Sequence, residues 1–433
     1  MSNHNPFLYG NPVSSEHFIG RKNELRRIVG RINKGESTSI TGPFRCGKTS
    51  VLQYISNSKQ LDSLYGKESN KLIFSYLDVG ALGIEINQSQ FWDNALEKLQ
   101  NHINTNNVSS SLSEAYNTCK NNQFANFFLE KLIEEIKKDN LCLVLMLDVF
   151  DNVLYHKVLN STEFFGGLRG LASLSQGALA LVITGNTSLT ELNNQTQNFN
   201  RTGSAYFNFM DEIILGALQD NEVSKLLQLG NKHFKEHDKE FIIRIAGKHP
   251  YLLQTAASLL WDSYEDADKD EEQRVKYVVK EFNIKIIDKF ACSWKSWSLD
   301  MLKVFTSVAL MQMDSIDNLP ETPTRIRLDN NKLIHNIKHL LQELNVLERY
   351  GFLTKDKSIG GGWKISSEIL LHFVAAKLQQ ESGVTTLDNA SYEKWLKSQH
   401  GQVMASSADI LERISTTVLT SFFGGVTKAI LKS

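Results

Sequence analysis

Residues Gly42–Thr49 read Gly-Pro-Phe-Arg-Cys-Gly-Lys-Thr, and they match the spacing G-x-x-x-x-G-K-[ST] of a phosphate-binding loop in full. The preceding residues, Ser37–Thr41, are expected to form a short strand, and Ser50–Ile55 has the apolar spacing of a helix. A glycine loop between a strand and a helix start directs backbone N–H groups and the helix dipole at one anion. An ordinary glycine turn would not require the Lys-Thr ending. The stretch therefore predicts a triphosphate site.

The chemistry of this loop assigns a role to each of its polar residues. We expect the Lys48 ammonium to reach the β- and γ-phosphates and the Thr49 hydroxyl to bind Mg²⁺. The cradle around the nucleotide is expected to comprise these two residues together with Gly42, Arg45, Cys46, Gly47 and Ser50.

A phosphate loop of this kind requires a second buried strand that brings a carboxylate to the metal. The run Leu141–Leu147 is apolar throughout and ends in Asp148, which indicates a strand buried on both faces of a parallel sheet. Asp148 is the predicted metal ligand, whereas Asp151 fits a helix cap as well as it fits a catalytic role. Two further strands are expected at Leu72–Leu77 and Ala178–Ile183. Together these segments predict an α/β P-loop NTPase core, a parallel sheet with flanking helices.

Several other segments resemble one family, the bacterial STAND-type signal-transduction ATPases, which are AAA-like. The resemblance covers roughly residues 5–380 and is carried by Asn5-Pro6-Phe7, Gly10, Pro12-Val13, Phe18-Ile19-Gly20-Arg21, Gly203-Ser204, Phe207-Asn208, Leu215-Gly216 and Ala246–Gln254. It implies that ATP or ADP is the nucleotide, that Gly20 and Arg21 wrap the adenine, and that Pro250 lies on the adenine side of a helical lid. From the residues alone, we expect Phe18 and Ile19 to form an apolar platform for the adenine; the alternative is that they staple the next helix.

The chain departs from this family at two positions that act on the γ-phosphate. Val149 stands where the family usually has an acidic residue after the strand aspartate, and valine cannot activate water. The turn Thr184–Thr187, which follows the strand Ala178–Ile183, lacks the usual arginine. Thr184 is our candidate for sensing the γ-phosphate, and a plain turn is the alternative. We therefore expect ATP binding with slow or absent hydrolysis. Candidates for compensation are Asp151 and a charge donated across subunits by Arg169 or Arg201, each of which could instead be an ordinary surface residue.

The sequence predicts five regions. They are a nucleotide-wrapping segment and first helix (1–35), the NTPase core (36–218), a helical lid (219–290), a winged-helix domain (291–380) and a short helical C-terminal tail (381–433). Within the core, the Asn- and Ser-rich stretch Asn101–Gln123 reads as a surface insertion. Within the winged-helix domain we expect one helix over Leu333–Leu347, followed by two short strands. The apolar face of Asp409–Lys432 predicts a terminal helix that docks on the winged-helix domain or, alternatively, contacts a partner or membrane surface.

Composition limits the classes of function. The 433 residues are 41% hydrophobic and 22% charged, with 47 basic and 48 acidic side chains. This near-neutral balance gives no bulk attraction to nucleic acid. The four cysteines are far apart and predict neither a disulfide scaffold nor a cysteine-rich metal site. With no leader and no bilayer-length apolar run, we expect a cytoplasmic protein.

The sequence thus favours an ATP-binding signalling switch that self-associates or binds a partner protein when activated. The family resemblance places such a switch in a bacterial antiviral or conflict system. The alternative is a DNA-handling AAA+ ATPase, a loader or remodeller, whose winged helix binds DNA.

Overall fold

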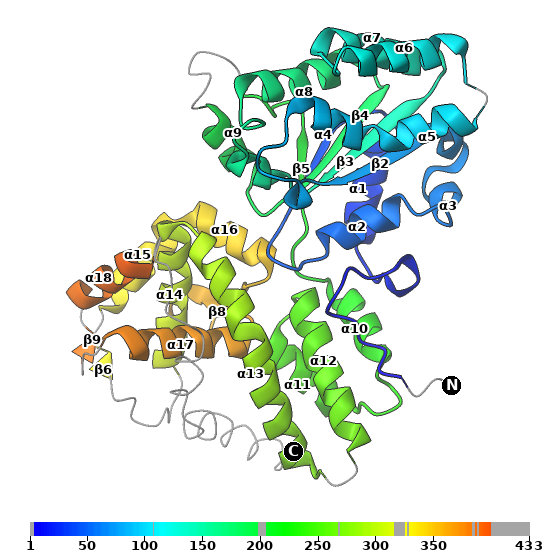
Figure 1. Ribbon diagram of the computed structural model, residues 1–433. Helices are drawn as coiled ribbons and strands as arrows, with labels where there is room; N and C mark the ends of the chain where they lie inside the picture. Colours follow the sequence, from blue (N-terminus) through cyan, green and yellow to red (C-terminus); the bar gives the residue numbers. More distant parts are fainter. Residues whose placement is uncertain are drawn as a thin grey trace. The chain divides into compact units, whose positions relative to one another are not determined.

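The computed structural model describes residues 4–106, 108–197, 205–266, 269–315, 325–326, 329–382, 386–387 and 389–399. The pattern of contacts divides the chain into two units. One unit is Pro12–Leu215, and the other combines Met1–Asn11 with Gly216–Ser433. Figure 1 shows the helices and strands of both.

A five-stranded parallel sheet forms the centre of the first unit. Its strands are β1 (Thr38–Thr41), β2 (Leu72–Asp78), β3 (Cys142–Asp148), β4 (Leu179–Gly185) and β5 (Asp211–Ile214), in the order β2-β3-β4-β1-β5. This confirms the predicted parallel core and its strands. Because β4 lies between β1 and β3, the turn that follows β4 lies between the ends of the other two strands.

Helices cover both faces of this sheet. The face with α1 (Lys22–Ile32), α2 (Lys48–Ile55) and α3 (Leu61–Tyr65) includes Cys142, Val144 and Met146 of β3 in its core. The opposite face, with α4 (Gln88–Ala95), α5 (Glu97–Thr105), α6 (Ser110–Asn121), α7 (Asn126–Lys138), α8 (Thr162–Leu174) and α9 (Leu189–Gln197), includes Leu143, Leu145 and Leu147. Alternate residues of β3 thus enter different cores, which explains why the strand is apolar without interruption. Short 3-10 helices connect these elements at η1 (Ser15–His17), η2 (Gly66–Lys71), η3 (Val79–Ala81) and η4 (Phe150–Tyr155).

The stretch Asn101–Gln123 is not a surface insertion, as its polar composition had suggested. It contains the end of α5 and the whole of α6, which buries Leu112, Tyr116 and Cys119 in the core. The serine run marks the start of a helix, because the Ser109 hydroxyl accepts a hydrogen bond from the Leu112 N–H at 3.1 Å. Polar cap residues were therefore mistaken for loop residues.

The second unit begins with four helices, α10 (Asp220–Gln228), α11 (Glu236–Ala246), α12 (Pro250–Glu265) and α13 (Glu271–Ser296). Pro250 occupies the first turn of α12, where a missing N–H has no cost. The N-terminal residues pack against these helices: the Asn5 amide donates to the backbone oxygen of Ser258 in α12 at 3.1 Å, and the Phe7 ring stacks on Phe234, between α10 and α11, with centroids 5.5 Å apart. The predicted boundary between residues 290 and 291 falls inside α13.

Three helices and an antiparallel hairpin follow, in the order of a winged helix. They are α14 (Leu299–Asp314), α15 (Asn330–His339), α16 (Leu341–Tyr350), β7 (Leu353–Lys355) and β8 (Trp363–Ile365), with η5 (Gly360–Gly362) in the hairpin. The single helix expected over Leu333–Leu347 is wrong, because Leu340 leaves helical geometry (φ −107°, ψ 52°) and divides it. Both halves contact α14. The two shorter helices thus pack on the same neighbour, and neither a glycine nor a proline in the sequence marks the break between them.

The remaining described elements are α17 (Glu368–Ser382), α18 (Asn389–Gln399) and a two-residue parallel pair of β6 (Arg325–Ile326) and β9 (Thr386–Leu387). The helix predicted over Asp409–Lys432, and with it the proposed membrane contact, lies outside the described residues, as do Arg201 and Gly203-Ser204. Among the described helices, none has the length and apolarity needed to cross a membrane.

Candidate phosphate-binding site

The loop between β1 and α2 has the backbone of an anion cradle. Gly47 caps α2 with a left-handed conformation (φ 100°, ψ 23°), so the helix begins at Lys48 with its first N–H groups unsatisfied within the helix. Gly42 is closely packed: a Cβ there would lie 2.3 Å from the Leu215 carbonyl oxygen and 2.8 Å from the Cys46 sulfur. The geometry of the loop therefore explains why glycine stands at both positions.

Three oxygens surround the Lys48 ammonium. Its Nζ donates to the carbonyl oxygens of Gly42 at 2.9 Å and Pro43 at 3.0 Å, which belong to the loop itself. It also donates to Oδ1 of Asn186 at 3.0 Å, in the turn after β4. The lysine is thus held over the loop with its charge near the first turn of α2, in position to meet an anionic group there.

Asp148 is buried at the end of β3 and accepts four hydrogen bonds. Oδ2 accepts from the Thr49 hydroxyl at 2.7 Å and from the Tyr76 hydroxyl at 2.9 Å. Oδ1 accepts from the Thr184 hydroxyl and from the Val149 N–H, the latter at 3.1 Å. Hydroxyl and carboxylate oxygens are the ligands that Mg²⁺ prefers, so Thr49 and Asp148 together fit the predicted metal site.

Tyr76 was not predicted as part of this site. Partial desolvation of the hydroxyl, aided by the Asp148 carboxylate, raises the pKa of the Tyr76 phenol well above its usual range, so the hydroxyl stays a donor at neutral pH. Its place follows from the pairing of β2 with β3, which sets Tyr76 beside Met146 and Asp78 beside Asp148. No local motif marks that pairing.

Val149, directly after Asp148, has a left-handed backbone (φ 51°, ψ 43°). This conformation is costly for a β-branched residue, by about 1–3 kcal/mol. Its N–H donates to Oδ1 of Asp148 and to the Thr184 hydroxyl at 3.0 Å. The valine backbone thus joins the ends of β3 and β4, while its apolar side chain offers no group that could accept a proton.

The turn after β4 contains two side chains with different partners. Thr184, our candidate for sensing the γ-phosphate, is buried and bonds to Asp148 rather than to the loop. Asn186 is exposed and bonds to Lys48. Within the predicted turn, the residue that meets the lysine is therefore Asn186.

Asp151 lies in η4 and contacts the same turn. Its Oδ2 accepts from the Asn186 N–H at 2.8 Å, and from both the N–H and the hydroxyl of Thr187 at 3.2 Å. One of the two oxygens of this carboxylate thus binds two backbone N–H groups and one hydroxyl of the turn after β4, and not the start of the helix that follows its own strand.

The segment predicted to wrap the adenine is anchored to the loop. Arg21 is buried, has a left-handed backbone (φ 62°), and donates from its guanidinium to the Cys46 carbonyl oxygen at 3.1 Å. Phe18 stacks on Tyr54 of α2 with centroids 4.4 Å apart. The Ser50 hydroxyl accepts from the Val13 N–H at 3.1 Å. These contacts bring the segment to the phosphate loop; the adenine contacts of Phe18, Ile19, Gly20 and Arg21 stay a prediction.

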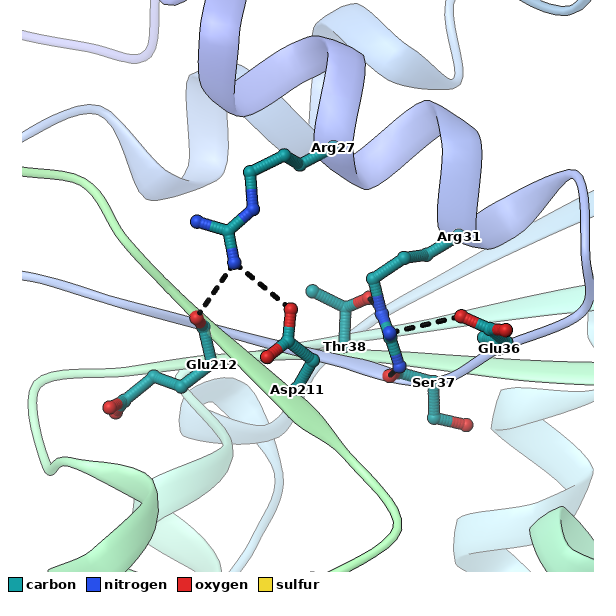
Figure 2. A network of polar contacts seen from close by, with 7 residues as sticks. All are labelled: Arg27, Arg31, Glu36, Ser37, Thr38, Asp211 and Glu212. Atoms are coloured by element: carbon teal, nitrogen blue, oxygen red, sulfur yellow. Dashed lines mark hydrogen bonds and ion pairs between the residues drawn. The ribbon is translucent and has the colours of Figure 1, made fainter.

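Polar contacts from α1 secure the strands beneath this site (Figure 2). Arg27 donates to Asp211 Oδ2 at 3.0 Å, and Arg31 donates to the Ser37 carbonyl at 2.7 Å and pairs with Glu36 at 3.0 Å. Ion pairs this exposed contribute about 0–1 kcal/mol each. Their role is to position α1 against β5 and against the residues that lead into β1, the strand before the loop.

Glu212 of β5 connects the end of β1 to the start of α9. Its Oε1 accepts from the Thr41 hydroxyl at 3.0 Å and from the Leu189 N–H at 2.8 Å, so the end of β1 and the start of α9 share one carboxylate. No sequence motif marks this glutamate as part of the site.

The roles predicted for Arg169 and Pro250 stay predictions. Arg169 is on α8, and the structure contains one copy of the chain, so a charge donated to a neighbouring subunit stays a prediction. Pro250 belongs to the second unit, and its role beside the adenine is likewise untested. In the described residues, no group of three or more His, Cys, Asp or Glu side chains forms a further metal-binding cluster.

Comparison with known proteins gives one family and several distant structures. A sequence model described as an AAA-like domain matches residues 10–269. No curated protein sequence matches significantly. Among solved structures, a Walker-type ATPase of Pyrococcus abyssi is 13% identical, covering 86% of this chain and 99% of its own, with a TM-score of 0.47. The ORC2 protein of Aeropyrum pernix in its ADPNP-ADP complexes is 13% identical, covering 84% and 97%, with a TM-score of 0.46.

Proposed function

This chain belongs to the AAA-like domain family and is an ATP-binding P-loop ATPase of that class, and from this premise we propose that it works as a nucleotide-controlled signalling switch of the STAND type. In this proposal, Mg-ATP binds at Lys48, Thr49 and Asp148, and hydrolysis is slow. The nucleotide state then governs the conformation of the downstream helices and the self-association of the chain.

The proposal is carried by the hydrogen bonding of two carboxylates, Asp148 at the end of β3 and Asp151 shortly after it. Both oxygens of Asp148 accept hydrogen bonds from neighbouring protein groups, and Asp151 Oδ2 holds the Asn186–Thr187 turn. Val149 replaces the residue from which a general base would act. An efficient ATPase needs a proton acceptor that reaches the attacking water. Groups that bind nucleotide and metal are present, whereas a dedicated base is lacking at this position.

Slow turnover suits a switch. A ligand shifts a conformational equilibrium only by its difference in affinity for the two states, and a bound triphosphate must persist long enough to report its presence. Asn186, bonded to the lysine expected to meet the γ-phosphate, is well placed to distinguish ATP from ADP.

The chain passes from β5 into the second unit at Gly216, and we place the conformational response to the nucleotide in that unit. We place this switch in a bacterial antiviral or conflict system on the family resemblance of the sequence.

Contacts in the winged-helix region favour this proposal over a DNA-handling role. The helix before the hairpin, α16, carries Glu343 and Glu348 rather than a row of cations. On the hairpin, Lys355 pairs with Glu348 at 3.8 Å and Lys364 with Asp356 at 2.9 Å. DNA binding depends on cations that neutralise phosphates, and both of these hairpin lysines already have acidic neighbours. Salt-dependent DNA binding by the purified chain would revive the alternative.

Mass spectrometry of the purified protein tests nucleotide binding directly. We expect co-purified ATP or ADP, and we expect light scattering to report different assembly sizes in the two nucleotides. Lys48→Ala should abolish nucleotide retention, because it removes the charge that meets the phosphates. Lys59→Ala removes an exposed lysine outside the loop and is the matched control. Unchanged occupancy in Lys48→Ala would refute the site, and a steady unstimulated turnover typical of ordinary ATPases would refute the slow switch.

A further inference from the structure

Asp151 holds the turn after β4 through a single carboxylate oxygen. Oδ2 collects three hydrogen bonds, from the Asn186 N–H at 2.8 Å and from the N–H and hydroxyl of Thr187 at 3.2 Å each. Several donors converging on one ionised oxygen define the position of the turn more firmly than neutral contacts would, because hydrogen bonds to charged groups are the stronger ones.

The packing around this carboxylate is close. Gly185 precedes the turn, and a Cβ on it would lie 3.1 Å from Cγ of Asp151 and 3.3 Å from each carboxylate oxygen. The absence of a side chain at Gly185 therefore lets the carboxylate approach the backbone. The other oxygen, Oδ1, is buried and makes no hydrogen bond to the described residues. Burying an acceptor without a hydrogen bond costs about 1–3 kcal/mol. The carboxylate thus makes its three hydrogen bonds through Oδ2 although Oδ1 is left without one.

The turn connects Asp151 to the phosphate loop. Asn186, whose N–H is bound by Asp151, presents its own side-chain oxygen to Lys48 Nζ at 3.0 Å. The three residues therefore form a chain that begins after β3, passes through the end of β4 and ends at the lysine of α2. Loss of the Asp151 carboxylate would free the turn and with it the Asn186 side chain, while the loop, Thr49 and Asp148 would keep their own contacts.

We propose that Asp151 is a positioning residue that fixes Asn186 at Lys48 and thereby sets the preference of the site for a nucleoside triphosphate over a diphosphate. This inference rests on the proposed nucleotide binding. It gives Asp151 a role distinct from the catalytic one considered for it, since the carboxylate acts through the turn and not on the attacking water. We expect the γ-phosphate to lie beside Asn186; because a diphosphate lacks that group, its binding should depend little on the turn.

The test compares the affinities of a non-hydrolysable ATP analogue and of ADP, both with Mg²⁺, by isothermal titration calorimetry on the full chain. Asp151→Ala should weaken the affinity for the ATP analogue about 10-fold, which is the loss expected for one hydrogen bond to a charged group. The affinity for ADP should change by no more than about twofold. Asn186→Ala should do the same, and the double variant should be no worse than either single one, because both act through one contact. Asp151→Asn keeps an acceptor oxygen and should restore part of the preference.

Asp356→Ala is the matched control. Its carboxylate also accepts from a backbone N–H and a hydroxyl of a turn, those of Ser358 at 3.0 Å and 2.6 Å, but this turn belongs to the second unit. It should leave the ratio of affinities unchanged. Equal weakening of both nucleotides in Asp151→Ala and Asp151→Asn, or an unchanged ratio, would overturn the inference. Failure of the unmodified chain to bind either nucleotide would instead refute the proposed function. If Asp151→Ala does not fold, Asp151→Asn and Asn186→Ala still decide the question.

Discussion

The hydroxyl of Thr49 donates to Oδ2 of Asp148 at 2.7 Å, across 99 positions of sequence. One residue lies in the first turn of α2 and the other at the end of β3, and these two elements are in contact. Tyr76 and Thr184 donate to the same carboxylate, so its orientation is fixed before any ligand arrives. The two predicted Mg²⁺ ligands are therefore assembled by the fold itself.

Removing the Thr49 hydroxyl should weaken the part of nucleotide binding that depends on Mg²⁺. We expect Thr49→Ala to weaken Mg-ATP binding about 10- to 100-fold, in line with about 1.5–3 kcal/mol for a contact to a charged group, and to affect binding in EDTA much less. Thr49→Ser keeps the hydroxyl and should bind nearly as the unmodified chain does. Fluorescent nucleotide titrations with and without Mg²⁺ measure this. An equal loss in both conditions would show that Thr49 supports the loop and not the metal.

Val149 provides a direct test of the missing base. Val149→Glu places a carboxylate after Asp148, and we expect the rate of ATP hydrolysis to rise by about 100-fold, within the range of general base catalysis. Val149→Gln has the same size without the proton acceptor and should stay slow. Release of inorganic phosphate under saturating ATP is the measurement. Equal rates in the two variants would place the hydrolytic defect elsewhere.

The core of this fold could be predicted because its signals are local. The loop Gly42–Thr49 has a defined spacing. The strand β3 is apolar at every position before Asp148, because its alternate residues enter two different cores. Local signals do not predict the roles of Tyr76 and Asn186. The role of Tyr76 depends on the pairing of β2 with β3, and that of Asn186 depends on the direction of the turn after β4. The break at Leu340 and the burial of α6 follow in the same way from tertiary packing, which overrode the apparent pattern.

Gly42 and Gly30 should respond oppositely to alanine. At Gly42 the added Cβ meets the Leu215 carbonyl oxygen at 2.3 Å, so Gly42→Ala should distort the loop, abolish nucleotide retention and cost about 1–3 kcal/mol. Gly30 lies inside α1 with no atom near its missing Cβ, so Gly30→Ala should stabilise by about 0.5–1 kcal/mol. Thermal unfolding without nucleotide, and nucleotide content after purification, measure both effects. A Gly42→Ala variant that retains nucleotide would show that the loop tolerates the added atom.

The four cysteines should differ sharply in their reactivity toward a maleimide. Cys46, Cys119 and Cys142 are buried and Cys292 is exposed. Burial raises the pKa of Cys119 to about 12 and that of Cys142 to about 11, so at pH 7.5 the reactive thiolate is scarcer than in an ordinary cysteine. We expect one equivalent of label on the native chain, located at Cys292 by peptide mapping, and four after unfolding in urea. Labelling of Cys119 or Cys142 in the native chain at the rate of Cys292 would contradict their place in the two cores that enclose the sheet.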